Sequence, residues 1–298
     1  MLRNIAPARP RARASAHGRR MPLKRNAMKK RKGLLLRVST WLCAAVTFSV
    51  LAFLIAHIVV NGVPHIKPSL FALKYSADNV SLLPALITTV MAVLLSLLIA
   101  VPLGVFSAIY LVEYARRGNR LVKLVRMTAE TLAGIPSIVY GLFGSLFFVV
   151  WLGWGMSLLA GSFTLSIMIL PLVMRTTEES LKAVPDSYRE GSFGLGAGRL
   201  RTVFKIVLPA AAPGILAGVI LAVGRIVGET AALIYTAGSM AQIPQSPMAS
   251  GRTLAIHLYV LSSEGFNVGP AYATAVVLLV LVVGINALSA YAAKKIAS

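Results

Sequence analysis

The sequence predicts an all-α membrane protein with six transmembrane helices. Of its 298 residues, 57% are hydrophobic, and the mean hydropathy is +0.78, far above that of an ordinary soluble domain. Six apolar segments are long enough to cross a hydrocarbon core of about 30 Å. Most charged residues lie between these segments. We therefore divide the chain into a basic tail, residues 1–37, and one membrane domain, residues 38–298.

The six predicted spans cover residues 38–60, 82–112, 127–152, 157–174, 208–237 and 268–291. The first is too long for a typical signal peptide, and no small-residue cleavage site follows, so we expect an uncleaved helix. The third contains Pro136, which removes a backbone hydrogen bond and should kink the helix. Between the spans we expect polar loops at 61–81 and 238–267, a short basic loop at 115–126 and a charged stretch at 175–209.

The basic tail accounts for much of the formal net charge of +21. Residues 1–37 hold thirteen of the thirty Lys and Arg residues, and no acidic residue precedes Asp78. Such a tail can bind nucleic acid or anionic lipid. Beside a membrane span, it fixes topology and contacts lipid headgroups. Without interleaved aromatic residues or zinc-ligand spacing, we expect lipids and no nucleic acid as its partner, and a disordered conformation.

Loop charge predicts the orientation of the helices. One set of alternate loops carries the tail, five cations in 115–126, the charged residues of 175–205, and Lys294 with Lys295. The loops of the other side carry only Lys67, Lys74 and Arg252. Because cytoplasmic loops are enriched in Lys and Arg, both termini and the 175–209 stretch should be cytoplasmic in an inner-membrane protein.

The charged stretch 175–209 is predicted to form helices outside the bilayer. Two capping-box patterns, Thr176-x2-Glu179 and Ser187-x2-Glu190, predict helix starts. We expect a short helix ending near residue 185, a second over 188–195, a glycine-rich turn at 194–198 and a third helix from about residue 199. This amphipathic stretch could dock on a protein in the water phase. The alternative is a cytosolic loop that lies on its own protein.

Charged side chains inside the spans point to a polar interior. Glu130 lies in the third span, and Arg225 and Glu229 lie in the fifth. Each costs about 2.5–3.5 kcal/mol at a helix centre, so each should face a cavity or the bundle interior. Arg225 and Glu229 are four positions apart, which on one helix would allow an ion pair. The other interpretation is a polar pathway for an ion.

Two motifs resemble known families. The pattern Glu190-Gly191-Ser192-x3-Gly196-x9-Ile206-x-Leu208-Pro209 resembles the EAA loop of ABC-importer permeases, EAA-x3-G-x9-I-x-LP. It departs from that loop at Gly191-Ser192, where small residues replace two alanines. The resemblance implies the type I importer permease fold and a coupling helix that sits in a groove of an ATP-hydrolysing subunit. It makes Tyr188, Arg189, Glu190 and Gly196 the candidate coupling residues.

The stretch AGIPSIVYGLFG, residues 133–144, resembles the PstA-type permeases of phosphate importers, as does Gly-Glu-Thr-Ala at 228–231. Gly134, Gly141 and Gly144 in the first stretch should let helices approach closely. The resemblance implies three partners: a homologous PstC-like permease, a PstB-like ATPase dimer and a periplasmic PstS-like phosphate-binding protein. Arg225 would then offer its guanidinium fork to phosphate. The candidate substrate pathway is Arg225, Glu229, Thr230, Glu130 and Ser137.

Patterns typical of nucleotide-binding and hydrolytic enzymes are absent from the sequence. No Gly-x4-Gly-Lys-Ser/Thr pattern occurs, so ATP and Mg²⁺ are expected on a partner and no cofactor on this chain. Gly194, Gly196 and Gly198 look like a dinucleotide-binding loop, but Arg199 stands where the last glycine would be. We therefore predict a permease and not an enzyme. The alternatives are a permease for sulfate, molybdate or another solute, and a channel or membrane-embedded enzyme.

Overall fold

The computed structural model describes residues 23–116 and 118–297, which form helices joined by loops and contain no strand. Five helices are long and apolar enough to cross a membrane, and a sixth crossing is possible if one bent helix pair counts as a span. The predicted all-α membrane fold is therefore confirmed, with five or six crossings among the described residues. The chain divides into two compact units, residues 1–56 and 57–298.

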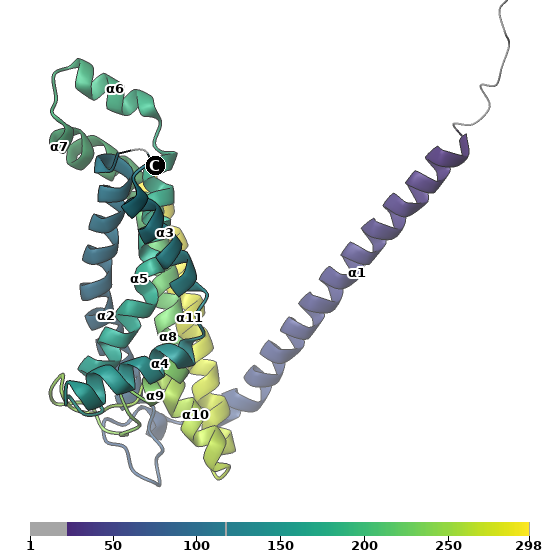
Figure 1. Ribbon diagram of the computed structural model, residues 1–298. Helices are drawn as coiled ribbons and strands as arrows, with labels where there is room; N and C mark the ends of the chain where they lie inside the picture. The colour runs from purple at the N-terminus through teal and green to yellow at the C-terminus, as the bar shows by residue number, and fades with distance from the viewer. Residues whose placement is uncertain (1–22, 117, 298) are drawn as a thin grey trace, which may run out of the picture. The chain divides into compact units, whose positions relative to one another are not determined.

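The first unit consists of most of helix α1, Leu23–Gly62 (Figure 1). Its large side chains from residue 36 onward are exposed all round, among them Trp41, Phe48 and Phe53. A helix that is apolar on every face suits a lipid environment. Residues 23–37, which we expected to be disordered, are helical, because the apolar helix continues back into the basic sequence. The rest of the predicted tail, residues 1–22, lies outside the described residues.

The second unit is built around α5, Leu158–Ala183, which packs against both α2, Leu83–Ile109, and α8, Leu208–Val227 (Figure 1). The last helix, α11, Val268–Ala297, packs against α8. Buried core side chains come from α2, α5 and α8, including Ala100, Leu165, Ile169 and Ala222. Buried hydroxyls bond to backbone: Ser166 Oγ donates to the carbonyl of Ser162 at 2.7 Å. These helices confirm the second, fourth and sixth predicted spans.

The third predicted span is broken into two helices. Helix α3, Arg120–Ala133, and the pair of α4, Ser137–Gly144, with the π turn η4, Ser145–Trp151, meet at 102°. The prediction of one continuous helix over 127–152 is therefore wrong. Pro136 has no N–H to donate and an extended ψ of 142°, so the helix stops before it and restarts at Ser137. The predicted basic loop is also shorter, because α3 begins at Arg120.

The fifth predicted span ends ten residues early. Helix α8 stops at Val227, and after Gly228 a short helix α9, Ala231–Ile234, follows. The predicted loop 238–267 contains α10, Leu254–Glu264, whose side chains Leu254, Ile256 and Leu261 are fully buried. Gly265 ends α10 with a φ of +74°, a left-handed conformation that favours glycine. The loop before α2 holds two short 3₁₀ helices, η1, Val63–His65, and η2, Pro68–Phe71.

The stretch 175–209 folds largely as expected, although both predicted capping boxes are wrong. Helix α5 runs through Thr176, whose hydroxyl donates to the carbonyl of Leu172 at 2.9 Å. Helix α6, Asp186–Gly194, begins directly after Pro185, so Ser187 lies inside it. Pro185 is the N-cap residue, with an extended ψ of 141° and no side-chain hydrogen bond, so no hydroxyl caps α6. The chain then turns through Gly196 into α7, Arg199–Thr202, the π turn η5, Val203–Val207, and α8.

Candidate functional site

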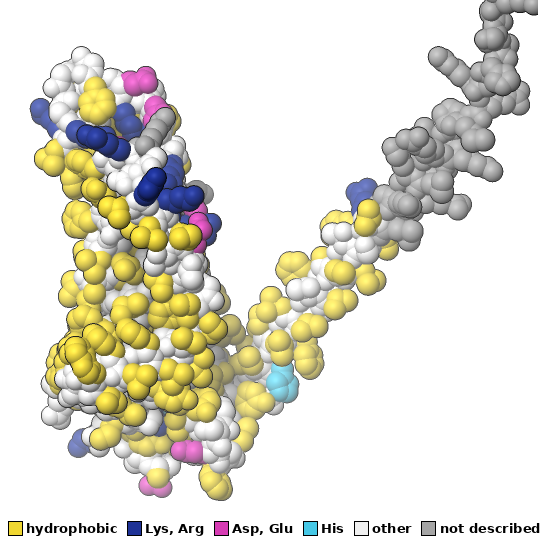
Figure 2. All heavy atoms as spheres, in the orientation of Figure 1, with side chains coloured by type: hydrophobic (Ala, Val, Ile, Leu, Met, Phe, Trp, Pro, Cys, Tyr) yellow, Lys and Arg dark blue, Asp and Glu magenta, His cyan; other side chains and the backbone are white. Residues whose placement is uncertain are grey.

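Helix α6 lies at one end of the second unit, beyond the membrane-length helices (Figure 1). In Figure 2, charged side chains gather at this end of the unit, next to a broad hydrophobic band. Tyr188 is 52% exposed, Glu190 is exposed, and Phe193 and Leu195 add apolar surface. The helix therefore presents aromatic, apolar and acidic groups on a surface that the described part of the chain leaves exposed.

The residues that depart from the EAA pattern are accommodated without conflict. Gly191 is exposed, with no atom within 4 Å of where a Cβ would lie. Ser192 is buried, and its hydroxyl lies 2.8 Å from the Thr202 hydroxyl on α7. Gly196 has a φ of +81°, a conformation that most side chains disfavour, so its part in the motif is to turn the backbone.

Arg189 points into the protein, unlike Tyr188 and Glu190. Its side chain is only 16% exposed, and its Nη2 lies 2.7 Å from Glu113 Oε1. The hydrogen bonds that Arg189 donates to the Glu113 carboxylate raise the pKa of Arg189 above its ordinary value, so its charge is permanent at physiological pH. Sequence reasoning missed Glu113. The available signal was a lone carboxylate at the end of the second span.

Arg225 and Glu130 line one cavity of about 280 Å³, with walls from α3, α5 and α8. Four cations and three carboxylates border it: Arg126, Arg175, Lys182, Arg225, Glu130, Glu178 and Glu179. Several are paired: Glu178 lies 3.0 Å from Arg126 and 2.8 Å from Lys182, and Glu179 lies 3.1 Å from Arg175. Among the described residues, no ion pair includes Arg225 or Glu130.

The structure does not bring Glu229, Thr230 or Ser137 to this cavity wall. The expectation that Arg225 and Glu229 share a helix face is wrong, because α8 ends between them at Val227. Glu229 is buried and accepts a hydrogen bond of 3.0 Å from the backbone N–H of Ala232, which caps α9. Thr230 is the N-cap residue of α9, and Ser137 is the first residue of α4.

The glycines of the 133–144 stretch behave differently from one another. A Cβ on Gly141 would lie 2.8 Å from Ala232 Cα in α9, and one on Gly144 would collide with Thr164 of α5. Close helix approach is therefore confirmed at these two positions. At Gly134 the nearest atom to an added Cβ is the carbonyl oxygen of Thr131 at 3.5 Å, an ordinary contact distance. The prediction of close helix approach is therefore wrong at Gly134.

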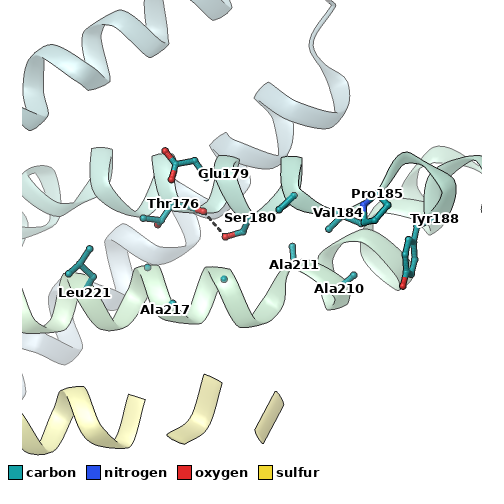
Figure 3. Close-up of a pocket in the computed structure, with 13 residues that line it drawn as sticks. Thr176, Glu179, Ser180, Val184, Pro185, Tyr188, Ala210, Ala211, Ala217 and Leu221 are labelled. Atoms are coloured by element: carbon teal, nitrogen blue, oxygen red, sulfur yellow. Dashed lines mark hydrogen bonds between the residues drawn. The ribbon is translucent and has the colours of Figure 1, made fainter. Parts of the chain in front are cut away.

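A second hollow, of about 590 Å³, lies between α5 and α8 and ends at Tyr188 (Figure 3). Thr176, Glu179 and Ser180 line it from α5, and small residues of α8 line the other side. Cβ atoms on Gly214 and Gly218 would collide with Ser180 and Thr176, respectively, so these glycines set the spacing of the two helices. Sequence reasoning missed this contact, although the Gly-x3-Gly spacing was a signal for it.

A bundle of membrane-length helices with a charged cavity and an exposed helix at one end fits a membrane transport protein. The chain belongs to the family described as binding-protein-dependent transport system inner membrane component, whose model matches residues 100–298. It is a multi-pass inner-membrane protein.

Similar sequences include several curated permeases. The chain is 34% identical over 239 residues to the probable ABC transporter permease protein YqgI of Bacillus subtilis, covering 75% of this chain and 81% of YqgI. It is 36% identical over 206 residues to the phosphate transport system permease protein PstA of Mycobacterium leprae, covering 68% and 67%. PstA of Pasteurella multocida is 35% identical over 221 residues, covering 68% and 74%. These matches confirm the PstA-type resemblance.

Solved structures confirm the fold alone. A chain of a bacterial alginate ABC transporter aligns with a TM-score of 0.67 at 15% identity, over 91% of this chain and 98% of its own. A chain of the MetNI methionine ABC transporter aligns with a TM-score of 0.55 at 22% identity, over 72% and 93%. The ABC importer permease fold inferred from the EAA-like pattern is therefore correct.

Proposed function

We propose that this chain is the permease subunit of an ATP-driven importer of inorganic phosphate and forms the translocation pathway with a homologous permease. The single observation that carries this proposal is its similarity to PstA permeases over about two thirds of their length. The charged cavity beside α8 gives the proposal a physical basis, since an oxyanion needs a hydrogen-bonding cation inside a membrane protein.

Arg225 is the residue we assign to phosphate contact. Its guanidinium can give two parallel hydrogen bonds to an oxyanion, and it has no carboxylate partner among the described residues. Glu130 lines the same cavity, and its negative charge would weaken the hold on phosphate and so favour release. In this proposal Glu229 and Thr230 shape the turn after α8, and Ser137 begins the helix α4 that packs against α9.

The orientation and partners complete the proposal. The positive loops would place α6 and both termini in the cytoplasm. A PstB-like ATPase dimer would bind the exposed face of α6, a PstC-like permease would pair in the membrane, and a PstS-like protein would deliver phosphate from the periplasm to the outer loops. ATP would be hydrolysed on the ATPase, and this chain would perform no catalysis. Closure of the ATPase dimer would move α6 and switch access to the cavity.

A double-mutant cycle tests the role of Arg225. Arg225→Gln should abolish uptake of radiolabelled phosphate, and Arg225→Lys should keep part of it, because lysine keeps the charge and loses the fork. Glu229→Gln should have a small effect, since the amide oxygen still accepts the Ala232 N–H. The double variant should transport no better than Arg225→Gln.

Uptake is compared at equal membrane levels of each variant. A double variant that transports like the parent would show that Arg225 and Glu229 act as an ion pair, and the phosphate-binding role of Arg225 would be lost. A parent complex that imports another oxyanion and no phosphate would refute the proposed cargo.

A further inference from the structure

The guanidinium of Arg189 uses all five of its N–H donors. Its Nε lies 3.2 Å and its Nη2 2.7 Å from Glu113 Oε1. Nη2 also donates to the carbonyl of Leu181 at 2.9 Å, and Nη1 donates to the carbonyl of Val184 at 2.8 Å and to Asp186 Oδ1 at 3.1 Å. Arginine alone among the side chains supplies five donors in one rigid fork, so neither lysine nor glutamine can reproduce this set.

These contacts join α6 to two membrane helices. Glu113 belongs to the π turn η3, Tyr110–Tyr114, which continues α2. Leu181 and Val184 lie at the end of α5, where the last helical carbonyls have no intrahelical partner. Arg189 satisfies two of these carbonyls and binds the end of α2 at the same time. A single side chain of α6 therefore holds the ends of α2 and α5 together.

The turn η3 places the carboxylate for this contact. Glu113 lies within this π turn, whose i→i+5 hydrogen bonds widen the helix and change which residues share a face. Glu113 is only 9% exposed, whereas Tyr110, at the start of the turn, is 57% exposed. A buried carboxylate without its cation would be costly, so Glu113 and Arg189 depend on one another.

Arg189 supplies the ion pair that holds the N-terminal half of α6 against the rest of the protein. Among the described residues, Arg189–Glu113 is the only ion pair that joins α6 to another helix, because Arg189–Asp186 lies within α6. At its other end, the Ser192 hydroxyl bonds to Thr202 on α7. Tyr188, Glu190 and Phe193 remain exposed on the outer surface.

We propose that Arg189 is a positioning residue that transmits the movement of α6 to α2 and α5 through Glu113 and the carbonyls of Leu181 and Val184. The inference rests on the proposed function in one respect, namely that a partner ATPase moves α6. It assigns separate tasks to neighbouring residues: Tyr188 and Glu190 bind the ATPase, and Arg189 passes the movement into the membrane.

The test compares two carboxylate-to-amide substitutions, each at a carboxylate that contacts the Arg189 guanidinium. Glu113→Gln removes the carboxylate that ties α6 to α2, and Asp186→Asn removes the exposed carboxylate within α6. In the assembled transporter, Glu113→Gln should lower the ratio of phosphate imported to ATP hydrolysed by about 2- to 30-fold. Asp186→Asn should leave this ratio at the parental value. Arg189→Lys should also lower the ratio, because lysine keeps the charge but cannot supply the five donors.

Glu113→Gln and Arg189→Lys should copurify with the ATPase as the parent does, because both side chains are largely buried and the exposed face of α6 is unchanged. Asp186→Asn changes one exposed side chain of α6, so its ratio is compared at equal ATPase copurification. Glu190→Lys serves as the contrast, since it should reduce ATPase copurification directly. If Glu113→Gln keeps the parental ratio, or Asp186→Asn lowers it equally, Arg189 does not transmit the movement. If Glu113→Gln loses ATPase binding or membrane level in step with uptake, the pair serves assembly, and the positioning role is also refuted.

A distance measurement separates this inference from the choice of cargo. Nitroxide labels at the exposed Ser187 of α6 and Ser107 of α2 should give a narrow distance distribution in the parent and in Asp186→Asn. The distribution should broaden in Glu113→Gln, because α6 loses its tie to α2. A narrow distribution in Glu113→Gln would overturn the inference, whatever solute the complex imports. Failure of phosphate uptake in the parent, with broadening in Glu113→Gln, would refute only the proposed cargo.

Discussion

Gly141 packs so closely against α9 that one added methyl group should be harmful. A Cβ there would lie 2.8 Å from Ala232 Cα, 2.9 Å from the Ala231 oxygen and 3.1 Å from the Ala232 oxygen. All three are backbone atoms, which cannot rotate away as a flexible side chain would. Since overpacking of this kind costs about 1–3 kcal/mol, Gly141→Ala should destabilise the protein by about 2 kcal/mol.

Gly134→Ala, seven residues earlier in the same stretch, is the matched control. Its Cβ would meet only the Thr131 oxygen at 3.5 Å, an ordinary contact, and its φ of −87° suits alanine. Its stability should therefore change by less than about 0.5 kcal/mol. In detergent, thermal unfolding of Gly141→Ala should begin about 5 °C below that of the parent, and Gly134→Ala should match the parent. Equal midpoints for all three proteins would show that α4 and α9 do not pack as described.

Two further predictions concern α10 and α6. Burial and the charge of Arg252 lower the pKa of His257 from 6.5 in the unfolded chain to about 3 in the folded protein. The neutral imidazole therefore contributes its full stabilisation above pH 6.5, and this contribution decreases as the pH falls toward 3. The free energy of unfolding should therefore fall by up to about 2 kcal/mol between pH 6.5 and pH 5. His257→Gln should remove this part of the pH dependence. If the variant keeps the pH profile of the parent, His257 is not the group responsible. Gly191→Ala should stabilise α6 by about 1 kcal/mol without altering ATPase copurification, because no atom lies near its Cβ position. Reduced copurification of that variant would mean that the ATPase needs the glycine surface.

The fold class followed from the sequence because a lipid environment leaves few choices. Backbone groups in hydrocarbon must bond within their own segment, so long apolar runs become helices whatever their neighbours are. The amphipathic spacing of residues 188–195 and the glycines of 194–198 likewise predicted α6 and the turn at Gly196, since both signals act locally. Side-chain size predicted the tight contacts of Gly141 and Gly144.

Only the tertiary structure showed where the predicted spans are broken and which side chains pair across the fold. Pro136 predicted a kink, but the bend of 102°, the end of α8 at Val227 and the packing of α4 against α9 were visible only in the folded chain. The separation of Arg225 from Glu229 followed from that break. The direction of Arg189 was also invisible in sequence, because its carboxylate partner Glu113 lies 76 positions away. Local propensity determines which segments become helices, but side chains find their partners only when the folded chain brings distant residues together.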